Sequence, residues 1–252
     1  MAYTNSPLVN VTLLSHNHSG QRTHAIDTIT IHCVVGQCTA RRIGEIFQPT
    51  SRQASSNYGV GLDGSIGLYV EEKNRSWCSS SNANDQRAIT IEVASDTKEP
   101  YAVTDKAYNA LIELAADICR RNGIKKLVWS TDKNKRMNHL DGCNMTVHRD
   151  YANKSCPGTY LYERHGDIAA KVNTKLGATT ETPWTPKAGD TVMFNGNVHY
   201  SSSNSSKAAP CKPGKAKITQ TYNGKHPYHL VRIIGGGATV YGWVDKGTFT
   251  KA

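Results

Sequence analysis

The 252-residue chain is 38% hydrophobic and 20% charged, as is typical of globular proteins, and could form one large domain or a medium-sized and a small one. Its formal net charge of +10 is compatible with a polyanionic partner. No apolar run approaches the roughly 20 residues of a membrane-spanning helix, and residues 1–15 lack the pattern of a secretory signal peptide. We therefore expect no membrane span and synthesis in the cytoplasm, so that any action outside depends on release by another factor.

The first 180 residues alternate strand-like and helix-like segments, which predicts an α/β layered structure. The expected elements are, in chain order, a strand at 28–35, a short helix capped by Thr39, a hairpin over 58–70 that turns at Asp63-Gly64, a strand at 88–93, a helix from Thr104 to Gly123, a strand at 126–130 and a helix over 158–176.

Composition changes after this region. Residues 178–186 are rich in Thr and Pro and predict an extended linker. Beyond them the sequence contains only short strand-like segments and turns, which favours a small closed β-barrel. We thus predict a domain over 1–177, a linker over 178–186 and an all-β domain over 187–252. The barrel strands are expected at 191–194, 216–222, 228–234 and 238–244, with Gly235-Gly236-Gly237 turning the last hairpin.

Positive charge is concentrated in the second domain. Residues 184–252 contain nine Lys or Arg and two Asp, a net charge of +7. This asymmetry suggests that the second domain meets a polyanion, either nucleic acid or the anionic polymers of a bacterial wall. A solubilising surface without a partner is the alternative.

The chain contains seven cysteines, an odd number without a signal peptide, which argues against a disulfide framework. Most are expected to be buried thiols, but Cys156 follows His148 by eight residues, and His32 lies on a predicted strand. Two imidazoles and a thiolate can hold zinc while leaving a fourth position open to water. Because a lone strand histidine or cysteine is more often structural, spacing alone leaves this zinc site open.

Three segments strengthen the zinc hypothesis. Residues 28–32, 147–151 and 153–158 resemble the zinc-ligand segments of the type-2 N-acetylmuramoyl-L-alanine amidases, a superfamily that includes peptidoglycan recognition proteins and many phage endolysins. The order and separations fit over about residues 25–176. The resemblance implies a mixed central β-sheet flanked by helices and a Zn²⁺ cofactor. It also implies hydrolysis of the amide bond between N-acetylmuramic acid and L-alanine, which lyses the cell wall.

The resemblance also assigns site residues. It implies His32, His148 and Cys156 as zinc ligands. The superfamily places a lysine two residues before the third ligand, and here Lys154 would stabilise the oxyanion that develops on the scissile carbonyl. The alternative for Lys154 is a solvated loop position.

Two subtypes of the superfamily use either a tyrosine near the hairpin or a glutamate on the next strand. Alignment on Asp63-Gly64 puts Ser56 at the tyrosine position, with Tyr58 two residues further on, whereas Glu92 matches the glutamate. Since a carboxylate in a β-branched strand is costly unless it is paired or functional, we predict Glu92 as the general base. A solvent-facing Glu92 on an edge strand is the alternative.

Substrate contacts are predicted for Asn57, Tyr58 and Trp77. Tyr58 could instead be structural, and Trp77 could pack the core beneath the groove. Trp77 precedes Cys78 where family members commonly have tryptophan followed by histidine, which leaves the contact there open.

The second domain resembles a bacterial SH3-like wall-binding domain, mainly through Val240-Tyr241-Gly242-Trp243-Val244. Its aromatic side chains could stack on sugars while lysines meet anionic wall polymers, or they could form the barrel core, which we expect for Trp243. The other aromatic candidates are Tyr200, Tyr222 and Tyr228.

The sequence thus favours a monomeric, endolysin-like zinc amidase whose partners are peptidoglycan and anionic wall polymers. A peptidoglycan endopeptidase is the nearest enzymatic alternative. The non-enzymatic one is a recognition module that binds peptidoglycan without cleaving it, but such relatives generally lose the cysteine ligand that Cys156 provides here. Nucleic-acid binding ranks last because no helix-turn-helix, zinc-finger or RNP-like pattern is present.

Overall fold

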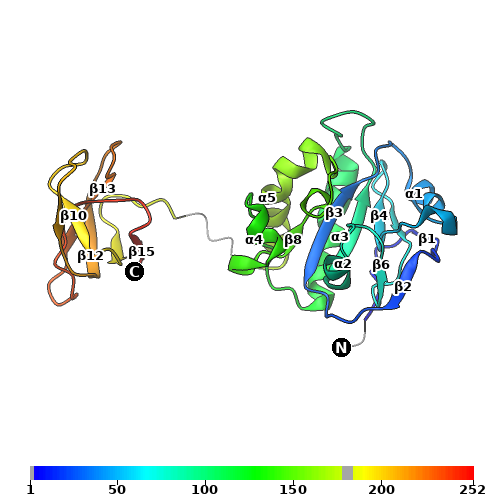
Figure 1. Ribbon diagram of the computed structural model, residues 1–252, viewed down its shortest axis with the longest axis horizontal. Helices are drawn as coiled ribbons and strands as arrows, with labels where there is room; N and C mark the ends of the chain where they lie inside the picture. Colours follow the sequence, from blue (N-terminus) through cyan, green and yellow to red (C-terminus); the bar gives the residue numbers. More distant parts are fainter. Residues whose placement is uncertain (1–2, 178–183) are drawn as a thin grey trace. The chain divides into compact units, whose positions relative to one another are not determined.

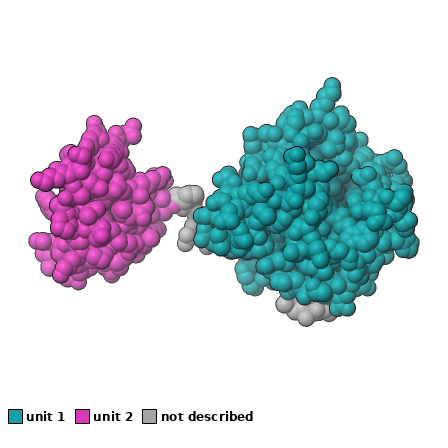
Figure 2. Space-filling model, viewed as in Figure 1, with its two compact units in different colours: residues 1–180 teal, residues 181–252 magenta. Residues whose placement is uncertain are grey.

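The computed structural model describes residues 3–177 and 184–252. The chain divides into two compact units, residues 1–180 and 181–252 (Figure 2). The division falls within the predicted linker of 178–186, of which residues 178–183 lie outside the described residues.

The first unit contains the strands and helices expected of an α/β structure (Figure 1). Its strands are β1 (Val11–Thr12), β2 (His18–Gln21), β3 (Thr28–Cys33), β4 (Tyr58–Val60), β5 (Ile66–Leu68), β6 (Asn74–Ser76), β7 (Ala88–Val93) and β8 (Met145–Thr146). Its helices are α1 (Ala40–Ile46), α2 (Asn82–Arg87), α3 (Asp105–Asn122), α4 (Lys133–Met137) and α5 (Gly158–Lys175), with 3₁₀ turns η1 (Thr50–Arg52), η2 (Leu140–Gly142) and η3 (His148–Asp150).

The central sheet has the strand order β1-β5-β4-β7-β3-β8. Strand β7 pairs in parallel with both β3 and β4, whereas β4 and β5 form the predicted antiparallel hairpin. The sheet is therefore mixed, as the sequence predicted.

The two faces of this sheet differ in chemistry. Because side chains alternate along a strand, Ile29 and Ile31 on β3 and Ile89 and Ile91 on β7 share one face, which packs against α3 and α5 in the main core. The intervening residues carry polar groups on the other face. These form register pairs across β3 and β7, namely Thr30 with Thr90 and His32 with Glu92. The candidate site thus lies on the face opposite the main core.

Local capping signals correctly predicted the helix ends. The Thr39 hydroxyl accepts a hydrogen bond from the Arg42 N–H at the start of α1, and Thr104 accepts one from the Ala107 N–H at the start of α3. Gly123 ends α3 in the left-handed region at φ 72°, where glycine carries no steric penalty.

The predicted strand at 126–130 is wrong. Its backbone is paired with side-chain amides rather than with a neighbouring strand: Leu127 N–H donates to Asn173 Oδ1 at 2.7 Å, and Val128 N–H donates to Asn144 Oδ1 at 2.8 Å. These bonds occupy groups that a ladder would need, so the segment lacks strand pairing.

The second unit is an antiparallel sheet with the strand order β11-β10-β14-β13-β12-β9-β15. Its strands are β9 (Thr191–Phe194), β10 (Val198–Tyr200), β11 (Ala208–Pro210), β12 (Gly214–Thr221), β13 (Tyr228–Arg232), β14 (Tyr241–Val244) and β15 (Phe249–Lys251). Within residues 184–252, no strand pairing joins the edge strands β11 and β15. The all-β prediction is confirmed, whereas the closed barrel is replaced by an open ladder.

The core of the second unit is mainly aliphatic, with Phe194 and Phe249 as its buried aromatic residues. Trp243 is not part of it, contrary to the expectation from sequence, and contacts His229 and Tyr222 instead. The reason is the alternation of β14, where the buried positions are Gly242 and Val244.

All seven cysteines are free thiols in the structure. Among residues 3–177 and 184–252, no helix combines the length and the apolar character needed to cross a membrane.

A buried ion pair holds the segment that carries His148. Arg136 and Asp150 have side chains exposed by only 2% and 0%, and the Arg136 Nε–H donates to Asp150 Oδ2 at 2.9 Å. The same carboxylate oxygen accepts the Val147 N–H at 3.2 Å. Asp150 therefore ties η3 to α4.

Asp150→Asn is expected to lower the free energy of unfolding by about 3–5 kcal/mol, because it leaves the buried Arg136 charge without its counter-ion. Chemical denaturation measures this. Lys171→Gln, which breaks a half-exposed pair with Asp167, serves as the control and should cost less than about 1 kcal/mol. Equal effects of the two substitutions would contradict the role given to Asp150.

Candidate metal and catalytic site

Three separate segments bring the candidate metal ligands together. His32 lies near the end of β3, His148 begins η3 directly after β8, and Cys156 precedes α5. Strand β8 pairs with β3 through Thr146 and Thr30, which places η3 beside the end of β3. The ligand positions therefore follow from sheet pairing and from the turn before α5.

The three side chains converge closely. One nitrogen of each histidine and the Cys156 sulfur lie within 4.8 Å of one another. The Cys156 Sγ is 3.4 Å from His32 Nδ1 and also accepts the Cys33 backbone N–H at 3.4 Å. The structure thus brings together the three residues that the sequence proposed as ligands.

Burial sets the protonation of this cluster. It lowers the pKa of His32 well below the ordinary value, and the neighbouring His148 and His165 lower it further. Burial, followed by the charge of Lys154, also lowers the pKa of His148. Both rings are therefore neutral near pH 7, the form in which imidazole binds a metal.

The donor set fits zinc. His32 Nε2 is buried without a hydrogen-bond partner in the described structure, so the protein itself does not satisfy both ring nitrogens. The Cys33 side chain, followed by burial, raises the pKa of the Cys156 thiol, so that a thiolate there needs a compensating cation. Two imidazoles and one sulfur leave room for a fourth, non-protein ligand.

Glu92 lies beside this cluster and is also poorly solvated. Its Oε2 atom is buried without a partner among the described residues, and its Oε1 atom is 3.9 Å from the Cys78 sulfur. Burial raises the pKa of Glu92 to about 7, although the charge of Arg52 opposes the shift. A carboxyl group with this pKa can both accept and release a proton near neutral pH.

Cys78 also lies close to His32. Its sulfur lies within 4.8 Å of a His32 nitrogen and a Glu92 oxygen, so these residues form a second close group. Burial raises the pKa of Cys78 well above its ordinary value, which keeps this sulfur protonated in the absence of a metal.

The site opens into a cleft of about 610 Å³. It is lined by Trp77, Cys78, His148 and the exposed Lys154. All four were singled out from the sequence, and Lys154 is the residue proposed to stabilise the oxyanion. The Trp77 indole N–H donates to Ser19 Oγ at 2.6 Å, which fixes the ring at the cleft wall.

Sequence reasoning missed other residues of the cleft, among them Arg52, Arg75 and Ser80. Ser80 has a positive φ of 64° and places its hydroxyl 2.9 Å from His148 Nε2. The two arginines add positive charge to the wall. Nothing in their local sequence distinguishes them from other loop residues, because only the tertiary fold brings them to the cleft.

Tyr58 and Asn57 are corrections to the predicted substrate contacts. Tyr58 pairs with Ile91, so its fully buried side chain points to the α3 face, away from Glu92. Its hydroxyl donates to Glu72 Oε1 at 2.7 Å. Asn57 is also fully buried, and its Oδ1 accepts hydrogen bonds from Arg22 and Thr90. Both side chains hold the framework together.

The raised pKa of Glu92 predicts a pH-dependent stability for the metal-free chain. An unfolded Glu92 has its ordinary value of 4.5, whereas the folded value is about 7, so ionisation destabilises the fold progressively as pH rises through this range. Glu92→Gln should therefore be more stable than the parent near pH 8, by up to roughly 3 kcal/mol, and similar to it near pH 4.

Urea denaturation at the two pH values measures this difference. Glu163→Gln, at an exposed position of α5, is the matched control and should change stability little at either pH. A Glu92→Gln protein that is less stable than the parent near pH 8 would contradict the desolvation of this carboxylate.

Two comparisons with known proteins give matches to this chain. Curated proteins give no match. Among solved structures, the chain is similar to a mutant endolysin from Bacillus subtilis, with 16% identity, a TM-score of 0.48 and coverage of 65% of this chain and 99% of that chain. It is also similar to the N-acetylmuramoyl-L-alanine amidase LysC from Clostridium intestinale URNW, with 18% identity, a TM-score of 0.45 and coverage of 65% of this chain and 97% of that chain. A third similar structure is drosophila peptidoglycan recognition protein SD, with 15% identity, a TM-score of 0.43 and coverage of 62% of this chain and 94% of that chain.

The family match is more extensive. Residues 22–159, more than half of the chain, match the Amidase_2 family, described as N-acetylmuramoyl-L-alanine amidase. This range includes β3, β7 and η3, and with them every residue of the candidate zinc cluster and Glu92. The chain belongs to the N-acetylmuramoyl-L-alanine amidase family.

Proposed function

We propose that the chain is a zinc-dependent hydrolase of the amide bond between N-acetylmuramic acid and L-alanine in peptidoglycan. The observation that supports this most is the convergence of His32, His148 and Cys156 within 4.8 Å, beside a carboxylate with a buried, unpartnered oxygen. Family membership supports the type of bond, and the cleft of about 610 Å³ gives a substrate access to His148 and Lys154, which line it.

His32, His148 and Cys156 would hold the zinc ion. Bound zinc would supply a Lewis acid that polarises the scissile carbonyl and acidifies the attacking water. Glu92 accepts the proton of that water and delivers it to the leaving amine, a role that its pKa of about 7 suits. Lys154, at the cleft wall, stabilises the negative charge that develops on the carbonyl oxygen.

A non-catalytic recognition module is the alternative function. Recognition requires only a cleft and its contacts. It does not account for Glu92, because leaving a carboxylate oxygen buried without a partner lowers stability and serves no purpose in binding. The buried, unpartnered oxygen of Glu92 therefore favours hydrolysis.

The second unit is proposed to bind the cell wall as an SH3-like domain. Residues 184–252 carry the net charge of +7, which suits attraction to anionic wall polymers. The proposed division is thus cleavage by residues 1–177 and wall attachment by residues 187–252.

Cys156→Ser should lose most of the bound zinc, because a hydroxyl is a poor replacement for a thiolate ligand. Metal analysis of the purified chain, which should contain one zinc per molecule, measures this. Cys211→Ser is the control, since this thiol belongs to the second unit and lies outside the cluster. Full zinc content and activity in Cys156→Ser would rule out the ligand assignment.

Glu92→Gln and Lys154→Met should retain zinc but hydrolyse peptidoglycan on the order of a hundredfold more slowly. Product analysis for free muramoyl ends and new L-alanine amino termini measures the rate. Tyr58→Phe, which changes a residue on the opposite sheet face, should remain active. An active Glu92→Gln together with an inactive Tyr58→Phe would assign the chain to the tyrosine subtype.

The fragment 1–177 should cleave soluble muropeptides but bind intact cell walls more weakly, because it lacks the net charge of +7. Co-sedimentation with walls at rising salt measures the charge contribution of the full chain, which screening should weaken. Undiminished wall binding by 1–177 would refute the proposed role of the second unit.

A further inference from the structure

The second unit exposes aromatic side chains that contribute nothing to its core. Tyr241 is 67% exposed and Tyr222 is 59% exposed, and neither they nor Trp243 and His229 belong to the buried cluster. Exposed aromatic rings that do not stabilise a fold commonly mark a binding surface.

Strand register gathers these rings on one face. His229 on β13 lies opposite Trp243 on β14, and Val231 lies opposite Tyr241, so these side chains project from the same side of the sheet. The His229 ring centre is 5.7 Å from that of Tyr241 and 5.4 Å from that of Trp243, and Tyr222 lies 6.3 Å beyond Trp243. The four rings form a continuous aromatic row.

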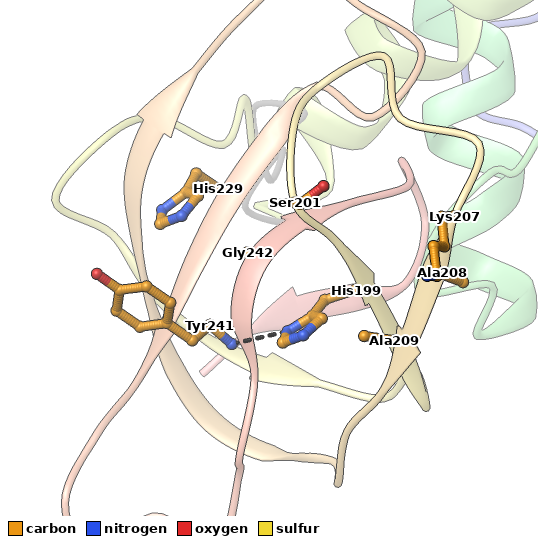
Figure 3. A pocket seen from close by; sticks show the side chains of 8 residues that line it. All are labelled: His199, Ser201, Lys207, Ala208, Ala209, His229, Tyr241 and Gly242. Atoms are coloured by element: carbon orange, nitrogen blue, oxygen red, sulfur yellow. Dashed lines mark hydrogen bonds between the residues drawn. The ribbon is translucent and has the colours of Figure 1, made fainter.

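A cleft of about 410 Å³ adjoins this row (Figure 3). His199, Ser201, Lys207, His229 and Tyr241 line it, together with Gly242. The His199 Nδ1 accepts the Tyr241 backbone N–H at 3.0 Å, and the His229 Nδ1 lies 2.6 Å from the Thr219 hydroxyl, so both imidazole rings are held in place. The cleft is therefore built from ordered side chains.

Gly242 makes this arrangement possible. A Cβ atom at this position would lie 2.6 Å from the Tyr200 carbonyl oxygen, a distance that real side chains do not adopt. Only glycine lets β10 and β14 approach this closely, and the approach brings His199 to the backbone of Tyr241.

The lining indicates the chemical class of the ligand. Aromatic faces pack against the C–H face of a sugar ring, while imidazole, hydroxyl and ammonium groups can bond its hydroxyl and acetamido groups. Among the described residues no carboxylate lines the cleft, and Lys207 is its only cation. This composition suits an uncharged saccharide better than a polyanion or a cationic peptide.

We propose that this cleft and the aromatic row bind the glycan strand of the bacterial wall, a chain of N-acetylated amino sugars. The inference rests on the proposed wall attachment of the second unit and locates it at specific residues. Contact with the glycan then comes from the rings, whereas the surrounding lysines attract anionic polymers.

The test uses the full chain and glycan strands from which stem peptides and anionic polymers have been removed and whose freed muramoyl carboxylates have been converted to neutral methylamides. We expect saturable binding that Tyr241→Ala and Trp243→Ala each weaken on the order of tenfold. Ile234→Ala, which removes an apolar side chain that is 98% exposed and outside the cleft, should leave Kd unchanged. Raising salt from about 0.1 M to about 1 M should change Kd little, because the contacts are not between charges.

Three outcomes would overturn the proposal: no binding to stripped glycan, binding only to stem peptides or anionic polymers, or undiminished binding by both aromatic variants. If Trp243→Ala unfolds, Tyr241→Ala alone decides, since its side chain is largely exposed. The stripped strands contain no muramoyl–alanine amide, so this result stays separate from the outcome for hydrolysis by the first unit.

Discussion

The parallel pairing of β3 with β7 is the constraint on which the first unit depends. The register that sets His32 beside Glu92 also sets Ile31 beside Ile91 on the opposite face, where α3 and α5 pack. A slip of one residue would put a carboxylate into the apolar core and isoleucines at the site. Core packing therefore stabilises the register that places the candidate metal ligand His32 next to the proposed base.

Desolvation gives the site its chemistry. It keeps both histidines neutral and brings the pKa of Glu92 to about 7, so metal binding and proton transfer are possible at the same pH. The charge of Arg52 opposes the shift at Glu92, whereas the charge of Lys154 adds to the lowering of the pKa of His148. Burial together with these positive charges suits a reaction in which negative charge develops on a carbonyl oxygen while a carboxyl group exchanges a proton.

Local signals predicted some features well. Thr39 and Thr104 cap helices through bonds within a few residues, and the strand-like segments at 28–35 and 88–93 form β3 and β7. The family resemblance proposed His32, His148 and Cys156, and the fold brings them together. These features depend on short stretches of chain.

Features that depend on distant parts of the chain could not be predicted from the sequence. Residues 126–130 have a strand-like composition, but Asn144 and Asn173 take their backbone hydrogen bonds. Tyr58 faces away from the site because of its register with Ile91, and Trp243 lies outside the core because Gly242 and Val244 take the inward positions. Neither register is encoded by the residues next to it.

Zinc K-edge X-ray absorption of the full chain identifies the atoms that coordinate the metal. We expect one sulfur neighbour at about 2.3 Å and nitrogen or oxygen neighbours at about 2.0–2.1 Å, including two imidazoles, with the same shell in Glu92→Gln. A shell without sulfur, with two or more sulfurs, or one that changes when Glu92 is replaced would contradict a His32–His148–Cys156 site with Glu92 as a separate proton carrier.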